Sequence, residues 1–377
     1  MMMAQRRSKI VVVGAGPAGA TAALQLSRQG VGEVLLLDRA TYPRRKVCGS
    51  GLSPNALRQL EILGLLDVIR PLHVPMKGLR AVGPAGSEIV LRGSKGAWVV
   101  PRTELDHRLV RAAVDAGAKL REGTRVTEIL RDDEGRARGV KTHDEEIEAD
   151  LVVVANGTPS NFERDEHPRE GIRTIMGWYE GRLPDQIGAM IWDRRLGGYY
   201  AWAFPEPGDV VNIGLTLPED HERGHDLREL FNEMLTEHFG DFASGERQIG
   251  KWAGHPATVT RRIGPIAFRR EIFVGEAARL VCPATVEGIS FAMQSGRLAA
   301  EAIAHSFTPD DGLSIVGQKR YQLDVATRIL PTFLAGETLY QVMRRPKLVA
   351  SIARMVDPER TGRLLSKLTG ERPTSAQ

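Results

Sequence analysis

Three glycines at fixed spacing near the start of the chain constrain its fold more than any other feature. Gly14, Gly16 and Gly19 form G-x-G-x-x-G between a β-branched run at 10–13 and a small-residue, helix-like segment at 20–29. The first glycine permits a tight turn, the second lets the backbone approach a pyrophosphate, and the third lets helix and strand pack closely. The helix N-terminus offers unpaired N–H groups and partial positive charge to phosphates. The sequence therefore predicts a dinucleotide-binding β-α-β unit.

An acidic residue ends the next apolar strand. Asp38 follows the buried-strand pattern of residues 34–37, about twenty residues after the glycines. A carboxylate at this place can accept hydrogen bonds from both ribose hydroxyls. The alternative is a glycine-rich structural turn that holds no ligand. This region is predicted to contribute the following cofactor-binding residues: Gly14, Ala15, Gly16, Pro17, Ala18, Gly19, Asp38 and Arg39.

Composition excludes several classes of protein. A chain of 377 residues with 42% apolar and 26% charged residues is ordinary for a globular protein. The net charge of +4 is far below that of a dedicated nucleic-acid binder, so no nucleic-acid partner is expected. Two cysteines, Cys48 and Cys282, favour a reducing compartment, and a cytoplasmic location is expected. Arg6-Arg7 could begin an export signal, but cleavage after it would remove the glycine motif.

The patterns along the chain predict an α/β fold with a discontinuous Rossmann-like domain. Further strands are expected at 151–154 and 272–274, and helices at 57–69, 104–116, 227–239 and 288–304. Turn-rich, aromatic stretches favour a second, mainly antiparallel-β domain that binds substrate. The predicted limits are 8–70, 98–160 and 265–310 for the nucleotide-binding domain, 71–97 and 161–264 for the substrate domain, and 311–377 for a helical C-terminal region.

Two late segments match the second half of a known flavin site. Gly275-Glu276-Ala277-Ala278 follows the strand at 272–274, and the segment 282–289 leads into a long helix. This arrangement is similar to the second FAD fingerprint of flavoproteins of the para-hydroxybenzoate hydroxylase type. The resemblance implies that FAD is the cofactor and that Glu276, where the group usually has Asp, contacts the ribityl chain. A helix N-terminus near the flavin would stabilise its reduced, anionic ring by ~1 kcal/mol. The residues implied here are Gly275, Glu276, Pro283, Gly288 and Ile289.

Two shorter segments resemble the same group. Arg102-Thr103-Glu104-Leu105-Asp106 opens a helix, and the matching arginine lies near the cofactor in those proteins. Ala155-Asn156-Gly157, followed by Ser160, resembles an Ala-Asp-Gly-x-x-Ser segment that helps to hold FAD and, in hydroxylases, governs nicotinamide reactivity. This chain has Asn156 where that segment has Asp, so the reductant is left open. It is either NAD(P)H or a reduced electron carrier such as a redox donor protein. The residues added to the predicted FAD site are Arg102, Val126, Asn156 and Gly157.

Two motifs point to a substrate. The segment from Pro43 to Gly49 resembles the Pro-x-x-x-x-Cys-Gly motif of the geranylgeranyl reductase family, and the segment 200–205 matches its Tyr-x-Trp-x-Phe-Pro motif. Enzymes of that family saturate carbon–carbon double bonds of prenyl chains with reduced FAD. The resemblance, which spans about residues 8–305, implies the same activity and a prenyl or lipid-like substrate. The predicted catalytic residues are Cys48, Tyr200, Trp202 and Phe204, and Cys48 and Gly49 are also predicted to border the cofactor.

The chemistry of these residues is consistent with that substrate. Tyr200, Trp202 and Phe204 alternate, so on a strand they face one way and form an aromatic wall suited to an apolar chain. The alternative is that the three rings fill a sheet core. Cys48 is interpreted as a small residue beside the flavin; a tuned thiol and a redox pair with Cys282 are the alternatives.

Other functions remain as alternatives. A flavin-dependent monooxygenase or halogenase acting on an apolar or aromatic small molecule shares the cofactor, although halogenases carry Trp-x-Trp-x-Ile-Pro where this chain has 200–205. A non-catalytic flavin-binding electron carrier is a third. His221-Glu222-Arg223-Gly224-His225 matches a zinc-protease signature, but its charge and its glycine argue against a metal helix, so no metal is predicted. The basic, apolar tail from Arg344 onward favours either peripheral contact with an anionic membrane or a solvated helix face.

Overall fold

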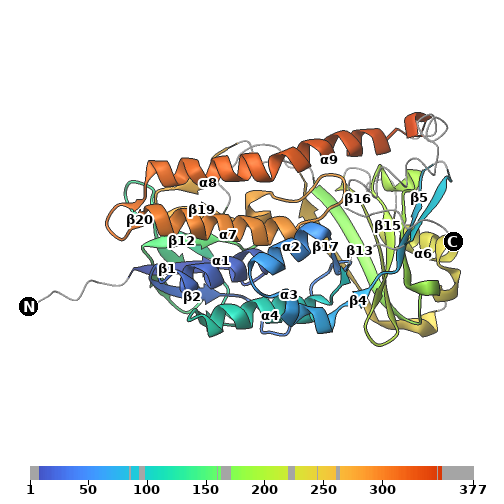
Figure 1. The fold of residues 1–377 in the computed structure, drawn as a ribbon, viewed down its shortest axis with the longest axis horizontal. Coiled ribbons are helices and arrows are strands. Elements are labelled where there is room, and N and C mark those ends of the chain that lie inside the picture. The colour runs from blue at the N-terminus through green and yellow to red at the C-terminus, as the bar shows by residue number, and fades with distance from the viewer. Residues whose placement is uncertain are drawn as a thin grey trace, which may run out of the picture. The chain divides into compact units, whose positions relative to one another are not determined.

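The chain forms two compact units in the computed structural model, which describes residues 8–84, 86–92, 98–158, 160–162, 171–219, 226–243, 245–259, 264–345 and 347–349 (Figure 1). Unit 1 is built from Met1–Lys46, Arg102–Arg169 and Ala257–Ala335, and unit 2 from Val47–Pro101, Glu170–Pro256 and Gly336–Gln377. The domain limits derived from the sequence remain a prediction. The two units differ from them mainly in placing residues 47–70 in unit 2 and in dividing the predicted C-terminal region 311–377 after Ala335.

Unit 1 is built around a six-stranded sheet with the order β18-β19-β12-β1-β2-β8. Every neighbouring pair is parallel except β18 and β19. The central strands are apolar on both faces, as expected for a parallel sheet that is covered on both sides. The strands are β1 (Lys9–Val13), β2 (Glu33–Leu37), β8 (Lys119–Arg121), β12 (Leu151–Val154), β18 (Ala267–Phe268) and β19 (Glu271–Phe273).

Four helices accompany this sheet, and the first of them packs against two others. The helices are α1 (Pro17–Arg28), α4 (Arg102–Asp115), α7 (Ile289–Ser306) and α8 (Ile315–Arg328). α1 lies against α4 and α7, and a Cβ on Gly296 of α7 would overlap the carbonyl of Ala18, so these two helices approach closely. The remaining elements of unit 1 are β9 (Glu128–Arg131), β10 (Ala137–Lys141), β11 (Glu146–Glu148), η6 (Gly275–Ala278), β20 (Phe307–Thr308) and β21 (Gly312–Leu313).

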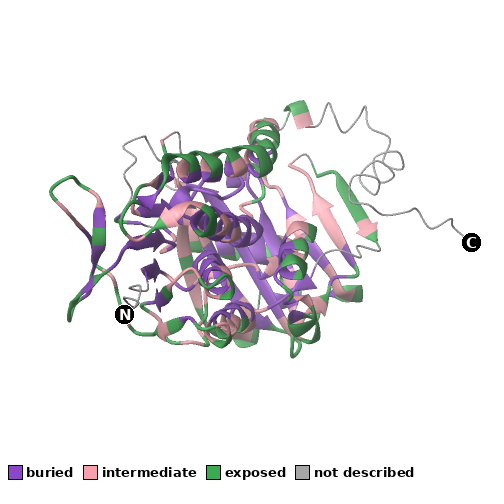
Figure 2. Ribbon diagram, turned by 60° about the vertical axis from the view of Figure 1, so that its left-hand side comes forward, coloured by how far each residue is buried: buried purple, intermediate pink, exposed green. Residues whose placement is uncertain are grey.

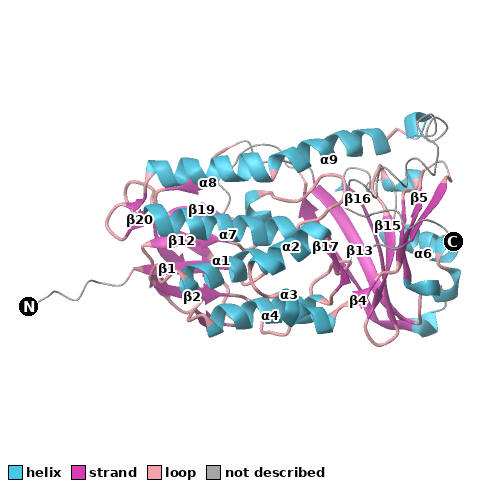
Figure 3. Ribbon diagram, in the orientation of Figure 1, coloured by secondary structure: helices cyan, strands magenta, loops and turns pink. Residues whose placement is uncertain are grey.

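Unit 2 is built on a seven-stranded sheet with the order β17-β13-β16-β15-β14-β5-β6. The pairs β13–β16, β16–β15, β15–β14 and β5–β6 are antiparallel, whereas β14 and β5 are parallel. Figure 3 distinguishes these strands from the helices. The strands are β5 (Gly78–Val82), β6 (Glu88–Arg92), β13 (Gly171–Glu180), β14 (Ile187–Ile191), β15 (Ala201–Glu206), β16 (Val210–Pro218) and β17 (Gln248–Thr258).

One face of this sheet packs against a helix and forms a core. Ala201 and Ala203 of β15 lie in one apolar cluster with Leu230 and Phe231 of α6 (Leu227–His238). Figure 2 shows most of the long strands as buried. Since side chains alternate along a strand, Trp202 and Phe204 lie on the opposite face.

Smaller elements complete unit 2. They are β3 (Gly51–Leu52), β4 (Val74–Pro75), β7 (Trp98–Val99), α2 (Pro54–Ile62), α3 (Leu66–Ile69), η1 (Arg70–Leu72), η2 (Pro184–Gln186), η3 (Arg194–Leu196), η4 (Gly240–Phe242) and η5 (Gly245–Arg247). The last described helix, α9 (Leu330–Met343), includes the boundary between the two units. Among the described residues, none of the helices combines the length and apolarity needed to cross a bilayer.

The predicted α/β fold is confirmed, with local corrections. The helix expected at 57–69 is interrupted, because Gly64 adopts a left-handed φ of +69° between α2 and α3. α1 begins at Pro17 rather than at Ala20, since proline is well suited to a first helical position. Residues 221–225, which match the zinc-protease signature, lie outside the described residues, as does most of the basic tail.

Candidate FAD and substrate sites

The glycine turn after β1 leaves no room for a side chain at Gly14 or at Gly19. Gly14 has φ +98°, and a Cβ there would lie 2.5 Å from the carbonyl oxygen of Ala155. A Cβ on Gly19 would overlap the carbonyl oxygen of Gly14. Gly16 is the N-cap of α1 and supplies no side-chain cap, so the first N–H groups of the helix are directed at the turn. This geometry matches a diphosphate cradle.

Asp38 is fixed beside that turn. Its Oδ2 accepts a hydrogen bond from the backbone N–H of Ala15 at 2.7 Å, and its Oδ1 accepts one from the N–H of Ala40 at 2.8 Å. The hydroxyl of Tyr42 donates to the carbonyl oxygen of Ala15 at 2.7 Å. Burial, together with the negative charge of Asp38, raises the pKa of Tyr42, so this hydroxyl stays protonated. The predicted ribose-binding acid is therefore held in place next to the phosphate turn.

An ion-pair network adds positive charge at the same turn. Arg102 donates to both carboxylate oxygens of Asp106, each at 2.8 Å. Arg44 lies 3.1 Å from Asp106, which is fully buried, and its Nη2 is 3.7 Å from the position of a Cβ on Gly16. Two arginines share one carboxylate, so the network keeps a net positive charge for an anion. The sequence interpretation included Arg102 but missed Arg44, whose only signal was the basic run at 44–46.

We expect Arg44→Ala to weaken the binding of FAD by about ten- to a hundredfold, because a charge-assisted hydrogen bond contributes about 1.5–3 kcal/mol. The measurement is flavin fluorescence on titration of the apoprotein. Arg45→Ala removes a neighbouring exposed arginine and serves as the matched control. Equal losses in the two variants would mean that Arg44 acts only through general charge.

The second half of the cofactor site gathers around Glu276. Its Oε1 is buried without a hydrogen-bond partner in the described part of the chain, and its Oε2 is 3.7 Å from the position of a Cβ on Gly157. Burial raises the pKa of Glu276, and the positive charge of Lys46 opposes this effect. A buried carboxyl oxygen without a partner is costly, and a ribityl hydroxyl would satisfy it. These residues therefore fit FAD.

The lead-in to α7 is a strained turn. Gly288 is the N-cap of α7 and provides no side-chain cap, as at the start of α1. The N–H of Val286 donates to the carbonyl of Cys282 at 3.0 Å, and Val286 adopts a φ of +55°. A β-branched residue in this region is a true outlier, of the kind that concentrates at ligand-binding turns.

Val286→Gly is expected to raise the free energy of unfolding by about 1 kcal/mol. Relief of about 1–3 kcal/mol of strain exceeds the cost of about 0.5–1 kcal/mol for a more flexible unfolded chain. Urea denaturation measures the change. Ala284→Gly, two residues earlier and at an ordinary φ, should instead lower the stability. If neither variant is more stable than the wild type, the backbone at Val286 is not strained.

The structure brings most of the predicted cofactor residues together in unit 1. These are Gly14, Ala15, Gly16, Pro17, Ala18, Gly19, Asp38, Arg102, Asn156, Gly157, Gly275, Glu276, Pro283, Gly288 and Ile289. Asn156 accepts a hydrogen bond from Ser160 at 3.0 Å. Arg39 is exposed beyond β2 and Val126 is partly exposed between β8 and β9. Their predicted contacts with FAD remain predictions.

Unit 2 holds the residues predicted for the substrate. A Cβ on Gly49 would lie 3.1 Å from Nε1 of Trp202 and 3.2 Å from the ring of Phe204, so the Cys48–Gly49 turn lies flat against the aromatic wall. Tyr200, just before β15, meets Trp202 edge-on with ring centroids 6.3 Å apart. The N–H of Cys48 is 3.2 Å from the sulfur of Met176. The two motifs of the sequence, about 150 residues apart, thus pack against each other, and Tyr200 and Trp202 are buried.

Both cysteines are free thiols, so the pairing of Cys48 with Cys282 is not formed in this structure. Cys48 is partly exposed and Cys282 is buried. Cys48 and Gly49 belong to unit 2, whereas the other predicted cofactor residues belong to unit 1. The contact of these two residues with FAD remains a prediction.

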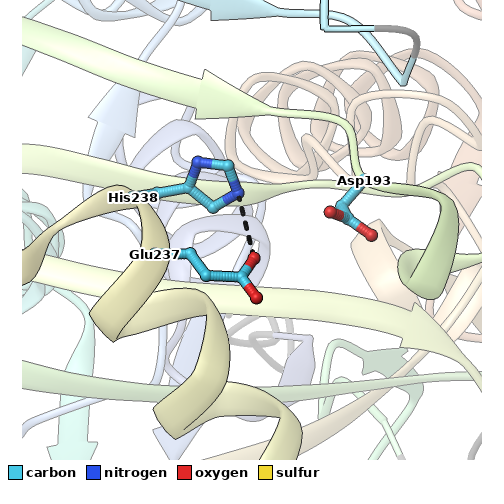
Figure 4. Close-up of side chains that lie close together, drawn as sticks. All are labelled: Asp193, Glu237 and His238. Carbon is cyan, nitrogen blue, oxygen red and sulfur yellow. Dashed lines mark ion pairs between the residues drawn. The ribbon is translucent and has the colours of Figure 1, made fainter.

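One further cluster of acidic and imidazole groups lies in unit 2 (Figure 4). Asp193, Glu237 and His238 have potential ligand atoms within 4.8 Å of one another. Arg195 lies among them, 2.9 Å from Asp193 and 3.1 Å from Glu237. Its hydrogen bond lowers the pKa of Glu237, and burial lowers the pKa of His238. The guanidinium supplies the positive charge that a metal ion would bring, so the cluster is a salt-bridge network.

Comparison with known proteins agrees with this geometry. The FAD binding domain family matches residues 7–186. The menaquinone reductase of Mycolicibacterium smegmatis is 31% identical over 325 residues, which cover 81% of this chain and 78% of that protein. The digeranylgeranylglycerophospholipid reductase of Methanothrix thermoacetophila is 28% identical over 326 residues, covering 81% and 80%.

A solved structure shares the fold over nearly the whole chain. The geranylgeranyl bacteriochlorophyll reductase-like protein from Thermoplasma acidophilum superposes with a TM-score of 0.79 at 21% identity, covering 97% of this chain and 92% of that one. The chain is thus an FAD-dependent oxidoreductase, and in unit 1 the glycine turn and the buried acid at Glu276 fit its cofactor. By its motifs and by its 31% identity to the menaquinone reductase over 81% of its length, the chain belongs to the geranylgeranyl reductase family.

Proposed function

We propose that this FAD-dependent oxidoreductase reduces carbon–carbon double bonds in the prenyl chain of a lipid. The observation that carries the proposal is the apolar packing in unit 2, where the buried ring of Trp202 and the half-buried ring of Phe204 lie against Gly49 without an intervening side chain. An isoprenoid chain offers only apolar contacts, and flat aromatic rings bind such a chain without requiring polar partners.

The residues divide into two roles. Bound FAD, once reduced, supplies the hydride. The turn at Gly14–Gly19, Arg44 and Glu276 would hold the cofactor, and the uncapped start of α7 at Gly288 would favour negative charge. Trp202 and Phe204 orient the prenyl chain of the substrate and exclude water. The protein therefore contributes mainly positioning and a dry environment.

The names of the relatives narrow the substrate class. The relatives that reach 31% and 32% identity act, by name, on menaquinone, and those at 25–28% on digeranylgeranylglycerophospholipids. Both kinds of molecule carry an isoprenoid chain on a polar head. A prenyl quinone is therefore the first substrate to test, with a prenylated glycerophospholipid second.

The test uses the purified holoenzyme. Its flavin is reduced without oxygen, and a prenyl quinone, a prenylated phospholipid or air is then added separately. Reoxidation by a prenyl compound with a gain of two hydrogens in the chain, measured by mass spectrometry, is the expected result. A product that carries oxygen or halogen and forms only in air would replace the proposal with the monooxygenase or halogenase alternative.

Two further predictions accompany this function. The electron donor is NAD(P)H or a reduced carrier, and it can be identified by which of them reduces the bound flavin. Peripheral contact with a membrane was predicted from the basic tail, of which Arg344, Arg345 and Lys347 are described. Arg344 lies over the ring of Tyr340 at 5.5 Å, and Arg345 donates to the carbonyl of Gln341, so these two arginines also have contacts inside unit 2.

A further inference from the structure

We propose that Asn212 is a positioning residue that holds the Cys48–Gly49 turn against the aromatic wall. Asn212 lies on β16, and its side chain is completely buried. It is on the sheet face opposite the α6 core, because its neighbours Val211 and Ile213 belong to that core. It therefore lies on the same face as Trp202 and Phe204.

The amide of Asn212 binds three groups at once. Its Nδ2 donates to the backbone carbonyl of Cys48 at 2.9 Å and to the carboxylate of Glu206 at 2.8 Å. Its Oδ1 accepts from the indole Nε1 of Trp202 at 2.9 Å. One side chain thus joins the turn that bears the cysteine to the ring that faces it, and its bond to the turn spans 164 residues of sequence.

Only an amide fulfils all three roles. A carboxylate of the same shape can accept from Trp202 but cannot donate to the carbonyl of Cys48, and an aliphatic side chain can do neither. Because the site is buried, losing the donors leaves the Cys48 carbonyl without its amide partner. The ring of Trp202 is fixed from its other side as well, since a Cβ on Gly214, its cross-strand partner, would overlap it.

The consequence is that the distance between the turn and the wall depends on the two donors of Asn212. A Cβ added to Gly49 would lie within 3.2 Å of both rings. A small movement of the turn therefore changes the space left for a prenyl chain. The claim about substrate rests on the proposed function, whereas the claim about the position of Cys48 does not.

The experiment compares two substitutions that divide the network. Asn212→Asp keeps the acceptor for Trp202 and removes both donors, whereas Trp202→Phe removes the indole donor and part of the ring but leaves both donors of Asn212 in place. The probe is the rate at which a small alkylating agent labels the thiol of Cys48 in the native holoenzyme, with the buried Cys282 as internal reference. Asn232→Asp, on the exposed side of α6, is the matched control.

We expect the thiol of Cys48 to be labelled about tenfold faster in Asn212→Asp than in the wild type. In Trp202→Phe and Asn232→Asp the labelling rate should stay within about twofold of the wild-type rate, because only Asn212→Asp removes the bond to the turn. Equal labelling of all four proteins, or equal acceleration in Asn212→Asp and Trp202→Phe, would overturn the proposal. Asn212→Ser avoids a buried charge and carries the same expectation. If neither Asn212 variant folds, the residue is structural and the proposal fails.

A kinetic measurement separates this inference from the proposed function. With a prenyl substrate, Asn212→Ser should raise KM about fivefold or more at unchanged flavin content, whereas a purely structural defect would lower the fraction of active enzyme at constant KM. If the wild type reduces no prenyl compound while the labelling result holds, the proposed function is wrong and the positioning role stands.

Discussion

Gly19→Ala is expected to yield a protein that is purified without FAD. A Cβ at this position would overlap the carbonyl oxygen of Gly14 and lie 3.0 Å from the Cβ of Ala155. Both neighbours belong to the turn and the strand end that form the cradle, so α1 would have to move away from β1. Overpacking against backbone costs about 3 kcal/mol, which corresponds to a loss of FAD affinity of about a hundredfold.

The absorption spectrum of the purified protein, followed by reconstitution with FAD, measures this effect. Gly264→Ala is the control in the same unit, because a Cβ there would meet nothing within 4 Å and its φ is not positive. The control should retain its flavin. A yellow Gly19→Ala protein with unchanged affinity would show that the turn is not the diphosphate cradle.

Gly214→Ala is expected to lower kcat/KM for a prenyl substrate by about ten- to a hundredfold, because a displaced side chain in a packed site costs about 1–3 kcal/mol. The new Cβ would overlap the ring of Trp202, with Cη2 at 2.6 Å, and would lie 2.7 Å from the Cβ of Met176. The indole would have to leave the wall, whereas the cofactor-binding residues of unit 1 would be untouched. FAD content should therefore stay the same.

Steady-state kinetics at matched flavin content tests this result. Gly240→Ala lies in the same unit and adds a Cβ in open space, so it should behave as the wild type. Full activity of Gly214→Ala would mean that the position of Trp202 does not matter to the substrate, which would remove the main support for the aromatic wall.

Local patterns predicted much of the fold correctly. The strands at 10–13, 151–154 and 272–274 were visible as short β-branched or apolar runs, and the helix of small residues after 288 was visible as a long apolar segment. Such elements depend on neighbours in sequence. The break at Gly64 was missed because a glycine inside a helical pattern is compatible with either continuation or termination.

The remaining parts of the site depend on contacts between distant residues. Arg44 is held near the glycine turn by the carboxylate of Asp106, 62 residues later, and by the hydroxyl of Tyr42. The role of Asn212 depends on its hydrogen bond to the backbone carbonyl of Cys48, and no sequence pattern predicts a contact with that atom. The strain at Val286 was equally hidden, since φ is a property of the folded turn and valine is unusual in it.

The interleaving of the two units has a consequence for biosynthesis. The chain leaves one unit for the other after residues 46, 101, 169, 256 and 335, and the parallel sheet of unit 1 takes its strands from residues as far apart as Lys9 and Phe273. A ribosome that has released only the first half of the polypeptide exposes β12 before its partner strand β19 exists. Nascent chains of this protein should therefore depend on protection by chaperones until the last third emerges.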